Sequence, residues 1–315
     1  NNNFRRFTLT WQDVQKNLYE HENFGGELRK SGAVKNILPA DIKTILKVED
    51  KADAILKFVQ TNYKWNKETN VLADKGIRNL ISTKSGNSAD INLLLSLWFD
   101  DAGIEANPVV LSTVQRGALM TYLPSLYQLN YVIAQVQIGK DAYLYDATSK
   151  YSSKDTLPPR ALNYSGFVMT EKTAKEVNIS YKDKSVTDLI IDAKLNPDGT
   201  FSGHFSDSDS KLYGMMVHEM YDDNKEEYLK SYSEKYKFPF KNVKSGPKGE
   251  GVFETSFDFD ADTFVDAIAN KLVFNPLLFL YAKNHGFDQE EERQSPLEFF
   301  SAYTKVKKVT ITLPE

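Results

Sequence analysis

The chain has 315 residues, enough for two domains, and its composition is that of a folded protein: 41% hydrophobic, 26% charged and 12% aromatic. The formal net charge is −4 and no basic stripe is present, which argues against nucleic acid as a partner. The chain contains no cysteine, so disulfides, thiolate metal sites and nucleophilic catalysis by one of its own thiols are excluded. No apolar run approaches the roughly 18 residues of a membrane-spanning helix.

The N-terminal residues do not have the apolar core of a signal peptide. Residues 1–3 are asparagines, and Arg5 and Arg6 follow them closely. The lack of such an apolar core does not identify the cellular compartment of the protein.

The first part of the chain, residues 1–182, begins with helical patterns. Apolar side chains recur at helical spacing in two segments, Trp11, Val14, Leu18 and Tyr19 in the first and Ala52, Ile55, Leu56, Val59 and Tyr63 in the second. Pro39, a favourable first-turn residue, opens a short segment over 40–46. A further helix is predicted from Ser88 to about residue 102, with Gly103 ending it.

After Gly103 the pattern changes to strands over 108–111, 131–138 and 142–145, with a hairpin turn at 139–141. The connection over 112–130 is longer than a routine loop and marks a candidate functional loop. This part of the chain is therefore predicted to be an α+β domain in which helices pack on a small antiparallel sheet.

Residues 183–315 are predicted to form a second, β-rich domain of unknown function. Strand patterns over 189–195 and 200–205 flank Asn196-Pro197-Asp198-Gly199, a strong hairpin signal. A helix is expected over 211–236, followed by strands over 240–243, 252–259 and 306–313. The pattern indicates a sandwich-like domain, or a single sheet, with one long helical insertion.

Three stretches of the first part could converge on one site. Gly86-Asn87-Ser88 places Ser88 at the N-terminus of a buried helix. Asn130-Tyr131 opens a strand, and Tyr145-Asp146-Ala147-Thr148 closes the next one. At such a place the helix dipole lowers the pKa of a thiol, and a histidine and an aspartate on neighbouring strands can act as base and orienter.

These stretches resemble the transglutaminase-like superfamily, which shares its core with papain-like cysteine peptidases. Members have a Gly-x-Cys motif opening a helix, an Asn-His or similar pair opening a strand, and Leu-Asp-Ala-Thr closing the next strand. The resemblance covers roughly residues 10 to 170. It is closest to a bacterial envelope subgroup, common in Bacteroidetes, whose core lies between two β-rich domains, and residues 291–296 with the strand after them resemble the trailing domain. The resemblance implies a periplasmic or exported protein.

The departures from the family pattern predict loss of catalysis. Ser88 stands where the family has its cysteine, Tyr131 stands where it has its histidine, and only Asp146 is retained. Tyrosine has a reference pKa of about 10 and is a poor base at neutral pH. Loss of one member of such a unit typically costs several orders of magnitude in rate. We therefore expect a degenerate site in which Ser88, or its rival Asn87, caps the helix and the Tyr131 hydroxyl bonds Asp146.

The resulting expectation is a noncatalytic binding or structural module. A groove that includes Asn87, Tyr122, Tyr127 and Asn130, with the 112–130 loop as one wall, would hold a protein or peptide. One alternative is a peptidase, amidase or acyltransferase with Ser88 as nucleophile, since helix-terminal amides could stabilise an oxyanion. A second alternative, a glycan-binding module, is suggested by the aromatic residues Trp65, Tyr122 and Tyr127.

No cofactor or metal is expected, and the oligomeric state is left open. The segment 218–222 is similar to a zinc-protease motif, but Asp222 replaces its second histidine. Asp258, Asp260 and Asp262 alternate with apolar residues as the polar face of a strand does. The run 206–210, alternating serine and aspartate, is predicted to be a loop that caps the helix after it.

Overall fold

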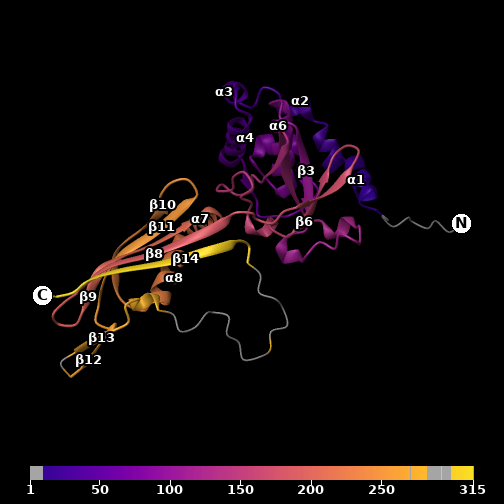
Figure 1. The fold of residues 1–315 in the computed structure, drawn as a ribbon. Helices are drawn as coiled ribbons and strands as arrows, with labels where there is room; N and C mark the ends of the chain where they lie inside the picture. The colour runs from indigo at the N-terminus through magenta and orange to yellow at the C-terminus, as the bar shows by residue number, and fades with distance from the viewer. Residues whose placement is uncertain (1–9, 270, 282–291, 293–298, 315) are drawn as a thin grey trace. The chain divides into compact units, whose positions relative to one another are not determined.

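The computed structural model describes residues 10–269, 271–281, 292 and 299–314, and it divides the chain into two compact units, one ending at Lys182 and one beginning at Asp183 (Figure 1). Both units combine helices with antiparallel strands, so the fold is α+β. None of the helices in the described ranges is long and apolar enough to cross a bilayer.

The first unit is built on a five-stranded antiparallel sheet. Its strands, in spatial order, are β5 (Asp141–Tyr145), β4 (Tyr131–Ile138), β3 (Ala106–Leu111), β6 (Ser165–Met169) and β7 (Ala174–Asn178). A separate parallel pair joins β1 (Lys64–Trp65) to β2 (Ser85–Gly86). The 112–130 connection between β3 and β4 contains two short 3₁₀ turns, η2 (Val114–Arg116) and η3 (Leu126–Gln128).

Helix α6 (Ser88–Asp101) is the centre of this unit, because every residue from Ser88 to Phe99 is buried. A helix buried on all sides belongs to the interior of a domain. It packs against β3, β4 and the helix α4 (Val48–Asn62). The remaining helical segments are α1 (Trp11–Glu20), the π-helical η1 (Glu22–Gly26), α2 (Ser31–Val34), α3 (Ala40–Lys43), α5 (Ile77–Thr83) and η4 (Pro159–Ala161).

The second unit contains one five-stranded sheet with helices on one face. Its strands, in spatial order, are β10 (Phe240–Pro247), β11 (Val252–Ala261), β9 (Phe201–Ser210), β8 (Lys184–Leu195) and β14 (Ala302–Thr312). Only the β14–β8 pairing is parallel. The other elements are α7 (Lys211–Asp223), α8 (Lys225–Tyr236), the hairpin β12 (Val265–Ile268) with β13 (Lys271–Phe274), and η5 (Leu278–Leu280).

Alternation along the strands divides this sheet into a buried face and a polar face. Leu189 and Ile191 on β8, Phe205 on β9 and Phe257 on β11 are buried, and the tyrosines of α8 pack against them. The core is therefore aromatic-rich and lies between the sheet and α8. Of the two architectures left open by the sequence, the single sheet with a helical insertion is the one observed.

Two predictions for the second unit are wrong in detail. The helix expected over 211–236 is two helices, because Asn224 adopts an extended conformation and its side chain accepts a hydrogen bond from Glu227 N, which starts α8. The loop expected over 206–210 is the end of strand β9, which pairs with β8 and β11 on both sides. Side-chain bonds such as Ser208 to Glu254 offset the low strand propensity of serine and aspartate there.

Most of the 291–296 segment that resembles a trailing domain lies outside the described residues. Asp258 and Asp260 lie on β11, as expected for the polar face of a strand, but Asp262 lies in a bend after β11 ends, so the prediction is wrong for that residue.

Candidate functional site

Asn87 caps α6. Of the two residues predicted as possible caps, Asn87 is therefore correct and Ser88 is wrong. The Asn87 Oδ1 accepts from Asp90 N at 2.8 Å, and Asp90 Oδ2 accepts from Asn87 N at 3.0 Å. This capping box requires an acceptor side chain three residues before Asp90, which is position 87. Ser88 is the first residue of the helix.

Ser88 is fully buried beneath the segment that follows Trp65. Its hydroxyl donates to Asn70 O at 2.9 Å and accepts from Asn70 N at 3.0 Å. Its backbone N–H donates to Glu68 O at 3.1 Å. The one hydroxyl proton is thus used in a backbone bond, and the N-terminus of α6 is closed by residues 66–76, which we call the covering loop.

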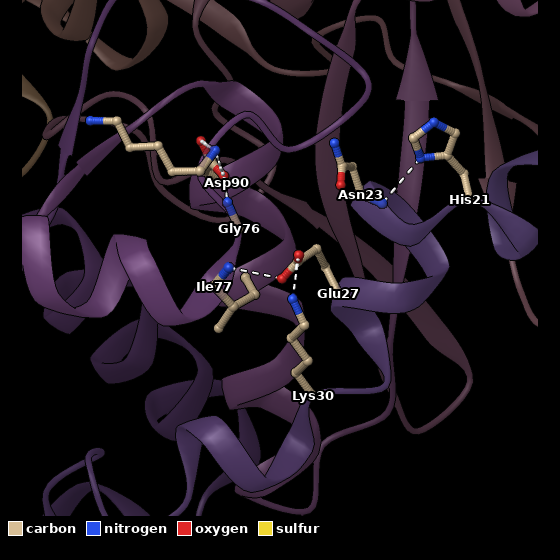
Figure 2. Close-up of polar contacts among 8 residues, drawn as sticks. His21, Asn23, Glu27, Lys30, Gly76, Ile77 and Asp90 are labelled. Carbon is tan, nitrogen blue, oxygen red and sulfur yellow. Dashed lines mark hydrogen bonds and ion pairs between the residues drawn. The ribbon is translucent and has the colours of Figure 1, made fainter.

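Two buried carboxylates hold the end of the covering loop (Figure 2). Asp90 Oδ1 accepts from Gly76 N at 2.8 Å, and Glu27 Oε2 accepts from Ile77 N at 2.8 Å. Lys30 Nζ lies 2.6 Å from Glu27 Oε1 and balances that charge. Gly76 has φ +74°, which other residues adopt only with strain. Asp90 therefore links the start of α6 to the start of α5.

Tyr131 and Asp146 contact each other directly. The Tyr131 hydroxyl donates to Asp146 Oδ2 at 2.9 Å and accepts from Arg160 Nε at 2.9 Å. Thr148 Oγ1 lies 2.7 Å from the Tyr131 hydroxyl oxygen and accepts from Arg160 Nη2 at 2.6 Å. Because the single Tyr131 proton goes to Asp146, the Thr148 hydroxyl donates to Tyr131, and every bond that the phenol oxygen can form is made.

Asn92 fastens α6 to this network. Its Nδ2 donates to Asp146 Oδ1 at 2.9 Å and to Val132 O at 2.8 Å, and its Oδ1 accepts from Ala147 N at 2.9 Å. Ser88 precedes Asn92 by one helical turn, so both lie on the same side of α6. Ser88, Tyr131 and Asp146 therefore lie on segments that Asn92 joins, but the side-chain bonds of Ser88 go to Asn70 rather than to Tyr131 or Asp146.

Electrostatics keep Tyr131 protonated. Its complete burial raises the pKa of the phenol well above its ordinary value, and the Asp146 charge adds to the rise; Arg160 opposes it only in part. The phenol is therefore a donor at neutral pH. The one histidine among residues 10–182, His21, accepts a bond from Asn23 N at its Nδ1 (Figure 2).

Of the four residues predicted to line a groove, two are engaged in the fold and two are exposed. Asn87 is buried, and its Nδ2 donates to Leu72 O at 2.9 Å. The Asn130 Oδ1 accepts from Thr113 N at 2.8 Å, and its Nδ2 donates to the Thr113 hydroxyl at 2.9 Å. Tyr122 and Tyr127 are 83% and 88% exposed.

Trp65, the third aromatic of the glycan-binding alternative, is half-buried. The guanidinium carbon of Arg160 lies 4.0 Å from its ring centroid, so one face of the indole is occupied by a cation–π contact.

Sequence reasoning missed Asn92 and Arg160. For Asn92 a signal was present, a polar residue inside the apolar run Ile91–Leu95, because a buried amide needs partners. No local pattern marks Arg160, which reaches Tyr131 from 29 positions further along the chain. In the described ranges, no group of three or more histidine, cysteine, aspartate or glutamate residues is arranged to hold a metal ion.

Comparisons with known proteins give weak structural similarities. No protein-family model matches the sequence, and no curated protein sequence matches it. A crystal structure of a candidate protease from Parabacteroides distasonis aligns over 86% of this chain and 55% of its own, with 10% identity and a TM-score of 0.43. A crystal structure of a transglutaminase aligns over 48% of this chain and 36% of its own, with 13% identity and a TM-score of 0.27. The chain thus spans about half the length of the first of these proteins.

Proposed function

We propose that this chain is a noncatalytic, transglutaminase-like binding module of a bacterial cell envelope, in which the former catalytic positions hold the fold together. The transglutaminase-like and envelope assignments rest on the ordered motifs at Ser88, Tyr131 and Asp146. The proposal of inactivity rests on the geometry of the same residues.

The observation that carries this proposal is the closed environment of Ser88. A serine nucleophile needs a base at its hydroxyl and an open approach for the acyl group. The Ser88 hydroxyl is buried, and both of its hydrogen bonds go to the backbone of Asn70. The base position is filled by Tyr131, a protonated phenol that donates to Asp146. These features favour a structural role over the hydrolase alternative.

The binding role is assigned to the 112–130 loop, which presents aromatic side chains on an ordered backbone. The Gln128 Oε1 accepts a hydrogen bond from Met120 N at 2.9 Å, and its Nε2 donates to Leu123 O. Arg116 donates to Tyr127 O. Because these bonds fix the loop before binding, Tyr122 and Tyr127 lose little conformational freedom when a partner covers them. Exposed tyrosines of this kind are enriched in interfaces with polypeptides.

Inactivity can be tested with a fluorophosphonate probe on the intact chain. We expect Ser88 to label no faster than the exposed Ser82, as read by peptide mass spectrometry. Stoichiometric labelling that disappears in Ser88→Ala would establish the hydrolase alternative instead.

The binding role can be tested with a peptide array. Tyr122→Ala with Tyr127→Ala should weaken capture of the peptides that bind the unaltered chain, whereas Tyr281→Ala, an exposed tyrosine of the second unit, should not. Equal capture by both variants would remove the loop as the binding surface.

A further inference from the structure

A polar pocket with aromatic walls lies in the second unit, and its lining includes Asp207 and Asp209 from the 206–210 end of β9. Its volume is about 320 Å³, and β8, β9, β14, α7 and α8 all contribute to its lining. The residues that matter for recognition are Asp207, Asp209, Tyr213, Lys235, Tyr303 and Lys305. The volume is at the lower end of the range typical of small-molecule sites.

Asp207 is the feature that marks this pocket as a site. The residue is only 6% exposed, and its Oδ2 accepts from the Tyr232 hydroxyl at 3.1 Å and lies 3.9 Å from Lys235 Nζ. Its Oδ1 has no hydrogen-bond partner among the described residues. A buried carboxylate oxygen without a partner is costly, so it points to a donor group that the protein does not itself supply.

Asp209 lies two residues further on β9 and faces the same side of the sheet. The Thr187 hydroxyl on β8 donates to its Oδ1. Lys235 and Lys305 bring two positive charges to the same pocket, so the four ionised groups sum to zero. A ligand that carries a net charge would be attracted by one pair and repelled by the other.

Aromatic rings form the wall beside these groups. The Tyr213 and Tyr303 ring centroids lie 5.8 Å apart with an interplanar angle of 34°, and the Phe299 ring lies 5.7 Å from Tyr303. These rings offer an apolar surface at the edge of a set of donors and acceptors. The ligand must therefore have one apolar face and several hydroxyl-like groups that both donate and accept.

We propose that this pocket binds an uncharged saccharide, whose hydroxyl groups donate to Asp207 and Asp209 and accept from the lysines while its C–H face stacks on Tyr213 and Tyr303. This site is distinct from the exposed tyrosines of the 112–130 loop and does not depend on the function proposed for the first unit.

The test is isothermal titration of the full chain with methyl β-glucoside, N-acetylglucosamine and maltose. Glycine and putrescine serve as zwitterionic and dicationic probes. Two variants change the pocket, Asp207→Asn and Tyr303→Ala, and Asp260→Asn is the matched control, since Asp260 lies exposed on β11 and pairs with Lys241. Circular dichroism confirms that each variant is folded.

We expect at least one saccharide to bind. Asp207→Asn and Tyr303→Ala should each weaken binding about tenfold, with Asp260→Asn unchanged, because each removes one strong contact. Failure of all three saccharides to bind would overturn the proposal, as would binding that neither pocket variant alters. Binding of glycine or putrescine alone would overturn it too, because the charge balance would then not select a neutral ligand.

Discussion

Under the proposed function, Tyr131 replaces a histidine, and this replacement preserves a hydrogen-bond network while reversing its chemistry. A histidine beside Asp146 would donate a hydrogen bond from one ring N–H to the carboxylate and keep the other ring nitrogen as a proton acceptor. The phenol donates its only proton to Asp146 and accepts from Arg160 and Thr148. Compared with a histidine at this position, tyrosine keeps the bond to Asp146 and offers no basic lone pair.

The value of this network to the fold can be measured with Tyr131→Phe. The change removes the phenol oxygen to which Asp146, Thr148 and Arg160 each make one hydrogen bond, so it should cost about 1–3 kcal/mol of unfolding free energy. All three tryptophans lie in the first unit, and their fluorescence during denaturant unfolding reports that unit alone. Tyr122→Phe, at an exposed tyrosine, is the control and should be near neutral; equal stabilities of the two variants would mean that the network contributes nothing.

Asp207 gives a prediction about pH. Burial raises the pKa of its carboxyl from 3.8 to about 6, and Asp209 adds to the rise while Lys235, Tyr232 and Lys305 oppose it. The pKa of Asp207 is higher in the folded chain than in the unfolded one. The stability that protonated Asp207 contributes is therefore fully present below about pH 4 and is lost as pH rises through about 6. The shift of about two units corresponds to about 3 kcal/mol.

Asp207→Asn should therefore stabilise the second unit relative to the unaltered chain, and the gain should grow from about pH 4 and level off above about pH 6. Thermal unfolding followed by far-ultraviolet circular dichroism, with tryptophan fluorescence identifying the first unit's transition, measures this difference. A gain that is constant with pH would show that the Asp207 pKa is not raised in the folded state.

Among the elements, the turn at Gly76 is the one on which the covering loop depends. A Cβ at Gly76 would lie 2.6 Å from Glu27 Oε1, and its φ of +74° is unfavourable for alanine. Gly76→Ala should destabilise the first unit by about 1–3 kcal/mol. Gly32→Ala is the matched control, because a Cβ there meets nothing within 4 Å and the residue is helical. Denaturant unfolding that ranks the two variants equally would contradict this account of the turn.

Long periodic elements were predictable from the sequence, and interrupted ones were not. The helices α1, α4 and α6 and the strand β4 follow from their apolar spacing. The break at Asn224 depends on one side-chain cap within a helix-forming run, so periodicity does not reveal it. The serine and aspartate end of β9 forms a strand through its two neighbours, which are non-local in the sequence.

At the scale of the whole chain, the two units differ in what the sequence reveals of their sites. In the first unit, motif order identified Tyr131 and Asp146, whose contact the structure shows, but not the covering loop that closes Ser88. In the second unit the pocket residues come from five separate elements and from Phe299, and the local pattern that includes Asp207 and Asp209, the run 206–210, predicted only a loop. Sites assembled from dispersed residues require the topology before they can be recognised.

Ser88→Cys measures whether the α6 N-terminus is closed and leaves a nucleophile there unactivated. The chain has no other thiol, so alkylation followed across pH reports this position alone. Ser82→Cys provides an exposed control on α5. We expect the thiol of Ser88→Cys to react much more slowly than the thiol of Ser82→Cys. No reactive thiolate should form at position 88 below the ordinary thiol pKa of about 8.5. Adding Tyr131→His should change neither result. Rapid alkylation of Ser88→Cys with a pKa well below about 8.5 would contradict both expectations.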